Sequence, residues 1–221
     1  MAGGKITRII FCLMVLSSAT VLRAEETARL YTEAHGQQVA TVEYRVSRTG
    51  ADAAVSSTGI DSTDLIRWHE GMGTYEWQMT DPKAGTALHG ERTGDVIHVT
   101  GTLKNRKIER DVKVDAALWY QVFGPLLEDL LPEGSRQKEF WVVDPDDLSA
   151  HKMQVKRAGT ERITIRGSAV ETFKIHFSPA GALSPFWGAD FWYRQSDGTY
   201  VSSRLPENGG VTVTTIEDPN Q

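Results

Sequence analysis

The chain has 221 residues, and 24 lysines and arginines against 29 aspartates and glutamates give it a formal net charge of −5. This acidic balance argues against a nucleic-acid-binding protein, which would carry a basic face. Cys12 is the only cysteine, so the chain can form no internal disulfide and no zinc site made of several thiolates. The length suits one domain with a sizeable core.

The first 24 residues have the order of features found in a secretory signal peptide. Lys5 and Arg8 are basic, residues 9–16 form a continuous apolar run, and small residues follow. Such an order is typical of an export signal, and the run is shorter than the roughly 20 helical residues that span a bilayer. We expect cleavage after Ala24, with Ala19 as the second choice.

Export places the remaining residues, 25–221, outside the cytoplasm as a single domain. Cys12 would leave with the signal, and an exported protein without disulfides fits a bacterial periplasm better than a eukaryotic secreted module. Cys12 follows Phe11 rather than a small residue at the cut, which argues against a lipid-anchored form. No second apolar span follows, so we do not expect a transmembrane protein.

Beyond the signal, the dominant hydrophobic period is two, which is the signature of β-strands. Residues 39–46, for example, place Val42 and Tyr44 on the same face. Turn signals such as Asp197-Gly198 separate the alternating runs. We therefore predict a mainly β fold, a curved antiparallel sheet that forms a half-barrel or open barrel. The expected strands lie at residues 39–46, 75–80, 96–103, 108–114, 140–143, 162–166, 170–177, 191–194, 199–204 and 211–216.

Residues 116–131 break this pattern, because their apolar side chains recur at helical spacing. Pro125 interrupts the run, so we expect a short or kinked helix, or two turns. We predict that residues 118–131 form a lid over the inner face of the sheet. A second short helical turn is predicted at residues 145–151, with Asp144 or Asp146 as its cap.

The final third of the chain carries the most specific pattern. A hairpin over residues 160–177 is followed by Phe191-Trp192-Tyr193, then Asp197-Gly198. This layout resembles periplasmic domains of unknown function built as an open β half-barrel, similar to the lipoprotein-carrier (LolA/LolB-like) fold. The resemblance implies a curved antiparallel sheet that wraps an apolar cavity under short helices. It says little about function, since one fold hosts many functions.

The sequence contains no recognisable catalytic motif and no metal or cofactor motif. It has neither a nucleophile elbow nor a phosphate-binding glycine loop, and none of its six histidines pairs at metal-ligand spacing. The cluster Asp144, Asp146, Asp147 and His151 could supply carboxylates for acid–base chemistry or calcium. It lacks the glycine and the spaced ligands of a calcium loop, so we prefer a capped turn after a strand.

Aromatic residues carry the strongest functional signal, because tryptophan serves both as core filler and as a ligand wall. The six tryptophans are many for this length. We predict that a subset lines a cavity, and that an apolar loop forms a rim or contact patch. The expected lining residues are Tyr44, Trp77, Trp119, Phe123, Phe173 and Trp192, and the expected rim residues are Phe186 and Trp187.

We favour a non-enzymatic periplasmic protein that binds or carries an apolar ligand or lipid between sheet and lid. One alternative is an envelope protein–protein interaction module, which would use a sheet edge or the Phe186-Trp187 loop. Another is a hydrolase at the aspartate cluster around His151, or a glycan-binding protein with exposed tryptophans. No cofactor is expected for any of these functions.

Overall fold

A computed structural model describes the chain over residues 25–59, 61–121, 124–131, 134–181, 187–207 and 210–219. Within these ranges the chain is built almost wholly from one 15-stranded sheet and contains no α-helix. The prediction of a mainly β, antiparallel fold is confirmed. No helix in the described part of the chain has the length and apolar character needed to cross a membrane.

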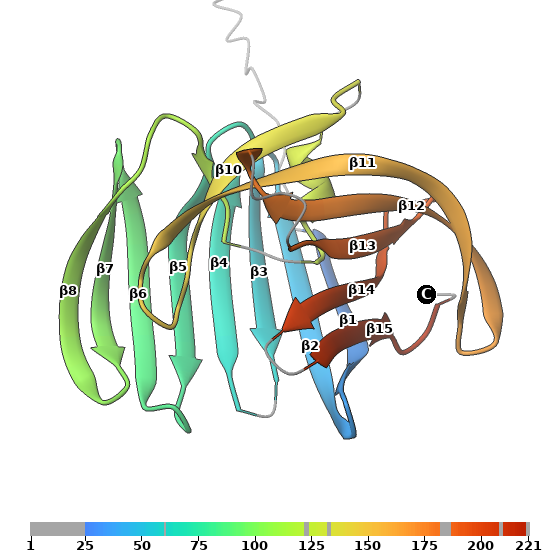
Figure 1. Ribbon diagram of the computed structural model, residues 1–221, viewed down its shortest axis with the longest axis horizontal. Coiled ribbons are helices and arrows are strands. Elements are labelled where there is room, and N and C mark those ends of the chain that lie inside the picture. The colour runs from blue at the N-terminus through green and yellow to red at the C-terminus, as the bar shows by residue number, and fades with distance from the viewer. Residues whose placement is uncertain are drawn as a thin grey trace, which may run out of the picture.

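Twelve of the strands close into a barrel (Figure 1). Around the ring, each strand pairs with the next, and almost all pairs are antiparallel neighbours in sequence. In ring order the strands are β5 (Gly73–Asp81), β4 (Thr63–His69), β3 (Asp52–Thr58), β2 (Gln38–Thr49), β1 (Glu25–His35), β15 (Gly210–Ile216), β14 (Tyr200–Glu207), β13 (Ala189–Arg194), β12 (Ser168–Pro179), β11 (Ala150–Ile165), β10 (Gln137–Val143) and β9 (Leu118–Trp119).

The ring closes through the two-residue strand β9, and the predicted half-barrel is therefore wrong. β9 runs parallel to β10 and pairs with β5 only where Trp119 meets Gly73. Gly73 has φ 81°, and a Cβ there would lie 2.3 Å from the Trp119 carbonyl oxygen, so only glycine allows this approach. Because β9 has only two residues and pairs with β5 at one position, it shows no alternation of apolar and polar residues. The alternation that predicts the longer strands therefore does not predict that the barrel closes.

Beyond Gly73, the free edge of β5 pairs with β6 (Thr86–Thr93) instead of with the barrel. β7 (Val96–Leu103) and β8 (Arg106–Lys113) extend this wing, which is green in Figure 1. The turn between β10 and β11 covers it: Lys104 Nζ donates to the Asp146 carbonyl at 3.0 Å, and Arg110 Nη1 donates to the Asp147 carbonyl at 2.7 Å. Consequently β5 and β10 are joined through β9 at one end, while beyond Gly73 β5 pairs with the wing instead.

Residues 124–131 form a plug inside one end of the barrel, and the predicted helical lid is wrong. The segment contains only the 3-10 turn η1 (Leu127–Leu130), with i→i+3 hydrogen bonds, a form that proteins use in short pieces. Its ends bind the wall, since Tyr193 Oη donates to the Gly124 carbonyl and Arg157 Nη2 donates to the Leu131 carbonyl. The buried side chains are Leu126, Leu127, Leu130 and Leu131.

Aromatic rings fill the barrel around the plug. Tyr31 stacks on Tyr200 with ring centroids 5.2 Å apart, and Phe173 stacks on Tyr193 at 5.3 Å. The Tyr31 hydroxyl donates to the Tyr200 carbonyl at 2.9 Å, so the polar end of this buried ring is satisfied. This half of the interior is a packed core.

The placement of the plug predicts that alanine substitution of two leucines has very different effects on the free energy of unfolding. Leu127→Ala removes a fully buried side chain, whereas Leu30→Ala changes a side chain that is 50% exposed on the outer face. We expect Leu127→Ala to lower the free energy of unfolding by about 2–5 kcal/mol and Leu30→Ala to change it by less than about 0.5 kcal/mol. Urea denaturation measures both, and equal effects would contradict the placement of the plug.

Candidate functional site

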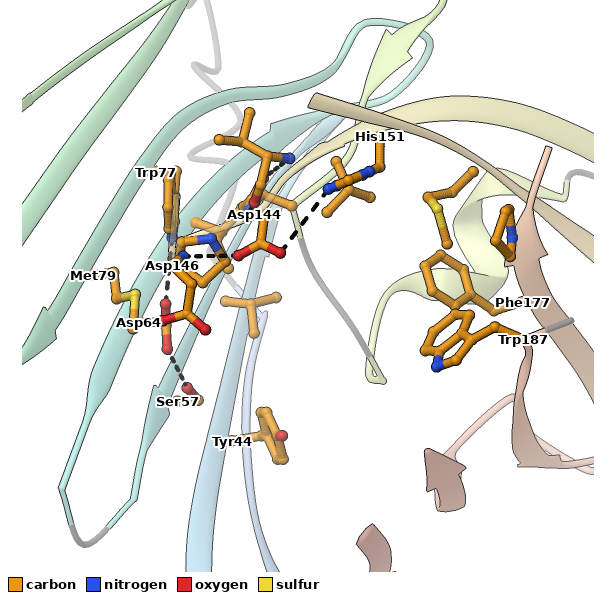
Figure 2. Close-up of a pocket in the computed structure, with 18 residues that line it drawn as sticks. Tyr44, Ser57, Asp64, Trp77, Met79, Asp144, Asp146, His151, Phe177 and Trp187 are labelled. Carbon is orange, nitrogen blue, oxygen red and sulfur yellow. Dashed lines mark hydrogen bonds and ion pairs between the residues drawn. The ribbon is translucent and has the colours of Figure 1, made fainter. Parts of the chain in front are cut away.

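A cavity of about 630 Å³ lies in the other half of the barrel. One wall is formed by β2 to β5 and the opposite wall by β10 to β12 with the segment before β13 (Figure 2). The first wall contributes Tyr44, Val55, Ser57, Asp64, Ile66, Trp77 and Met79. The second wall contributes Val142, Val143, Met153, Phe177, Pro179 and Trp187.

The cavity is a direct result of strand register. Asp64 and Ile66 of β4 share the inward face with Trp68, because side chains alternate along a strand. Trp68 lies at the plug end beside Asp129, while Asp64 lies near the β3–β4 turn and lines the cavity. The plug thus occupies one end of the inner face and leaves the other end uncovered.

The floor of the cavity is a closed network of hydrogen bonds around Gln121. Its Oε1 accepts from Trp119 Nε1 at 2.8 Å and from the Val143 amide at 3.1 Å, and its Nε2 donates to the Val143 carbonyl at 2.7 Å. The backbone N–H of Gln121 donates to Thr74 Oγ1 at 3.0 Å. These bonds link β5, β9 and β10 at the point where the barrel closes, so they fix the spacing of the two walls there.

Asp64 places a carboxylate in the otherwise apolar first wall. Trp77 Nε1 donates to its Oδ1 at 3.3 Å and Ser57 Oγ donates to its Oδ2 at 3.5 Å (Figure 2). Burial raises the pKa of the Asp64 carboxyl, and the two hydrogen bonds oppose that rise. A carboxylate offers about four acceptor positions, so these two long bonds leave capacity for a further donor.

The turn between β10 and β11 forms the side of the cavity where Asp144, Asp146 and His151 lie. Of the helical turn predicted at residues 145–151, one i→i+4 turn forms, in which the Leu148 amide donates to the Asp144 carbonyl at 2.9 Å, whereas His151 already belongs to β11. Asp144 Oδ1 accepts from the Asp146 amide, and Asp147 Oδ1 accepts from the Ser149 amide, both at 2.8 Å. The preferred interpretation of a capped turn is confirmed. The Ser149 hydrogen bond lowers the pKa of Asp147.

His151 does not form a Ser-His-Asp triad. Ser149 Oγ lies 2.8 Å from its Nε2, and Asp144 Oδ2 lies 4.0 Å from that same nitrogen. A triad needs the acid on one ring nitrogen and the serine on the other. Among the described residues, no group of three or more histidines, aspartates and glutamates is placed to hold a metal ion.

The structure brings three of the predicted site residues to the cavity. Tyr44, Trp77 and Trp187 line it, and Trp187 also donates from Nε1 to the Pro206 carbonyl at 3.1 Å. Trp119 is fully buried, and it packs with Trp77 over Gly90, where a Cβ would lie 3.3 Å from each indole. Trp119 therefore supports the wall from below the surface of the cavity.

Two predicted lining residues lie elsewhere, and two are not described. Phe173 packs in the plug half, where the Arg157 guanidinium lies 5.0 Å from its ring. Trp192 points outward, because side chains alternate along β13 and those of Phe191 and Tyr193 are buried inside the barrel. The Trp192 Nε1 donates to Glu161 Oε1 at 2.8 Å. Phe123 and Phe186 lie outside the described residues. Neither Phe173 nor Trp192 lines the cavity.

Sequence reasoning missed Asp64 and Gln121. Asp64 carried a usable signal, since it has the inward register of β4 together with Ile66 and Trp68. Gln121 carried none, because its partners Thr74 and Val143 come from distant strands.

Polar pockets flank the plug at the opposite end of the barrel. Glu128 lines two of them, and Asp129 Oδ2 accepts from Arg48 Nη2 at 2.9 Å. Burial, with the Asp129 charge as the next cause, raises the pKa of Glu128 to about 7. The linings of these pockets contain both acidic side chains and arginines, whereas the lining of the apolar cavity contains no arginine or lysine.

Comparison with known proteins gives no assignment. No protein-family model matches the chain, and no curated protein matches it. A β-barrel-like protein of the domain of unknown function DUF1849 from Brucella abortus has 8% identity and a TM-score of 0.49, over 86% of this chain and 94% of its own. A DUF1329 family protein from Desulfovibrio piger ATCC 29098 has 11% identity and a TM-score of 0.31, over 90% of this chain and 85% of its own. At these values neither structure assigns a family or a function.

The floor network predicts that Gln121 is important for stability. Gln121→Leu leaves Trp119 Nε1 and both backbone groups of Val143 buried without their partners. Each such group costs about 1–3 kcal/mol, so we expect the free energy of unfolding to fall by about 3 kcal/mol or more. Gln78→Leu, at an exposed position on β5, is the matched control and should be nearly neutral in the same denaturation experiment. Similar losses in both variants would contradict the proposed floor.

Proposed function

We propose that this protein is an exported, non-enzymatic carrier that binds an apolar small molecule or lipid in the barrel cavity. The cavity itself carries the proposal, because its volume of about 630 Å³ falls in the range of about 300–1,000 Å³ that small-molecule sites occupy. Its lining follows the usual composition of such sites, with apolar walls and a few polar groups.

The driving force for binding is burial of apolar surface. Ile66, Trp77, Met153 and Phe177 present apolar side chains to the cavity, and each ligand methylene moved from water to such a wall is worth about 0.8 kcal/mol. The ladder hydrogen bonds of the ring and the bonds of Gln121 fix the positions of the strands that carry the two walls. A ligand would therefore enter a space that the fold maintains.

The proposed compartment is the bacterial periplasm. It rests on the signal-like residues 1–24 and on a remaining chain without cysteine. The resemblance to lipoprotein carriers belongs to this proposal in a modified form. The shared idea is a sheet that wraps a guest, but here the sheet is closed and the segment expected as a lid plugs one end.

The alternative functions find less support. The edge strand β8 is charged at every position except Ile108 and Val112, and such edges resist pairing with another strand. Trp187, expected in a contact loop, packs 5.6 Å from Phe177 at the cavity. For glycan binding, the outward rings of Trp141 and Trp192 are each covered by a lysine.

The proposal predicts that filling the cavity abolishes binding. Ile66→Trp adds an indole to the first wall, whereas Leu65→Trp places the same group on the other face of β4. In titrations with the apolar fluorophore N-phenyl-1-naphthylamine, we expect Ile66→Trp to weaken binding by at least about tenfold, or 1.4 kcal/mol. Leu65→Trp should bind as the unmodified protein does.

Native mass spectrometry of protein purified without detergent provides a second readout. We expect an apolar adduct on the unmodified protein and on Leu65→Trp, and its loss from Ile66→Trp. If the unmodified protein carries no adduct and does not bind the fluorophore, the carrier function is wrong.

A further inference from the structure

We infer that the cavity selects amphiphiles whose polar end is a cation, such as an alkylammonium, over those that end in a carboxylate or phosphate. This inference rests on the proposed function, since it assumes that the cavity is the ligand site. It concerns the chemistry of the ligand head group, which the apolar walls alone do not specify.

The charges around the cavity have one sign. Its lining includes the carboxylates Asp64, Asp144 and Asp146 and the imidazole of His151, but no lysine or arginine among the described residues. The nearest basic group in contact with this set is Lys104, whose Nζ lies 3.7 Å from an Asp146 oxygen at an exposed position. The residues after position 24 that are not described also contain no lysine or arginine.

The adjoining depression at the same end of the barrel has the same character. It is lined by Glu33, Asp61 and Asp64 together with small and apolar residues, and no described basic side chain belongs to its lining. Lys83 lies outside this lining, but its Nζ pairs with Asp61 Oδ2 at 3.2 Å, so the charge of Asp61 is partly balanced. An anionic head group would meet like charge at Asp64 and at the turn that carries Asp144 and Asp146, which disfavours its binding.

Asp64 is the group best placed to contact the ligand. Elsewhere on the barrel, carboxylates pair with basic groups, as Asp115 does with Lys152 at 2.5 Å and Glu161 with Lys174 at 3.3 Å. Within the described part of the chain, the donors to Asp64 are the neutral groups of Trp77 and Ser57, at 3.3 and 3.5 Å. Asp64 is half-buried, and a carboxylate held partly out of water without a basic partner is costly, so a bound cation would offset part of that cost.

Aromatic rings beside Asp64 suit the same ligand. Tyr44 and Trp77 line the cavity with Asp64 (Figure 2), and a cation near an aromatic face gains electrostatic attraction from the ring, most strongly with tryptophan. Carboxylate and aromatic groups in one apolar wall are thus complementary to an ammonium group attached to an alkyl chain. A hydroxyl head group could donate to Asp64 but would gain no charge attraction.

The test uses three probes with the same chain: dodecylammonium, dodecanol and dodecanoate, below their aggregation concentrations. Each competes with bound N-phenyl-1-naphthylamine on the full-length protein at pH 7. We expect dodecylammonium to displace the fluorophore at a concentration at least about tenfold lower than dodecanoate, with dodecanol between them. This ranking uses the unmodified protein, so it does not depend on any variant folding correctly.

Asp64→Asn links the ranking to one residue, because asparagine keeps the shape and an acceptor for Trp77. We expect this variant to lose most of the preference for ammonium over carboxylate. Asp111→Asn is the matched control, since Asp111 is exposed on the outer wing beside His98; it should keep the preference.

The outcomes separate the two proposals. If dodecanoate binds as well as dodecylammonium, or if Asp64→Asn leaves the preference unchanged, the head-group inference is wrong and the carrier function stands. If neither the fluorophore nor any probe binds, the carrier function fails and the inference fails with it.

Discussion

The structure depends on one constraint, which is the way the barrel closes at Gly73 and Trp119. A single backbone pair joins β5 to β9 there, and only glycine at position 73 allows the approach. From that point β5 pairs with β6, while β10 continues around the barrel. Two walls that are joined at one end and separated at the other enclose a space that their own side chains do not fill.

The plug and the cavity are two consequences of the same inward face. At one end, the leucines of residues 126–131 and rings such as Tyr31 and Tyr193 pack into a core, and only smaller polar pockets remain beside it. At the other end, Gln121 fixes the spacing of β5 and β10 through its hydrogen bonds, and no comparable segment enters. Because protein interiors are otherwise close-packed, the proposed binding role rests on this space more than on any single residue.

Much of the fold could be predicted from the sequence, because the period of two directly reports which residues face inward. That period placed Tyr44 and Trp77 together on an inner face, and the structure places both on the cavity wall. It failed for Trp192, since Phe191-Trp192-Tyr193 is aromatic on both faces and offers no contrast to set the register.

The remaining failures share a cause, which is that the deciding contacts lie far apart in sequence. Residues 126–131 have leucines at spacings that suit an α-helix, but burial on all sides and anchors from Arg157 and Tyr193 favour a compact 3-10 plug. Barrel closure depends on one residue pair, and Gln121 binds Thr74 and Val143, which lie more than 20 positions away from it. A local pattern cannot report such contacts.

The most direct test of the account is a crystal structure of the protein pressurised with xenon, which enters apolar cavities. We expect xenon, or density for a co-purified molecule, between Trp77 and Phe177; direct packing of those two side chains against each other, with neither present, would contradict it.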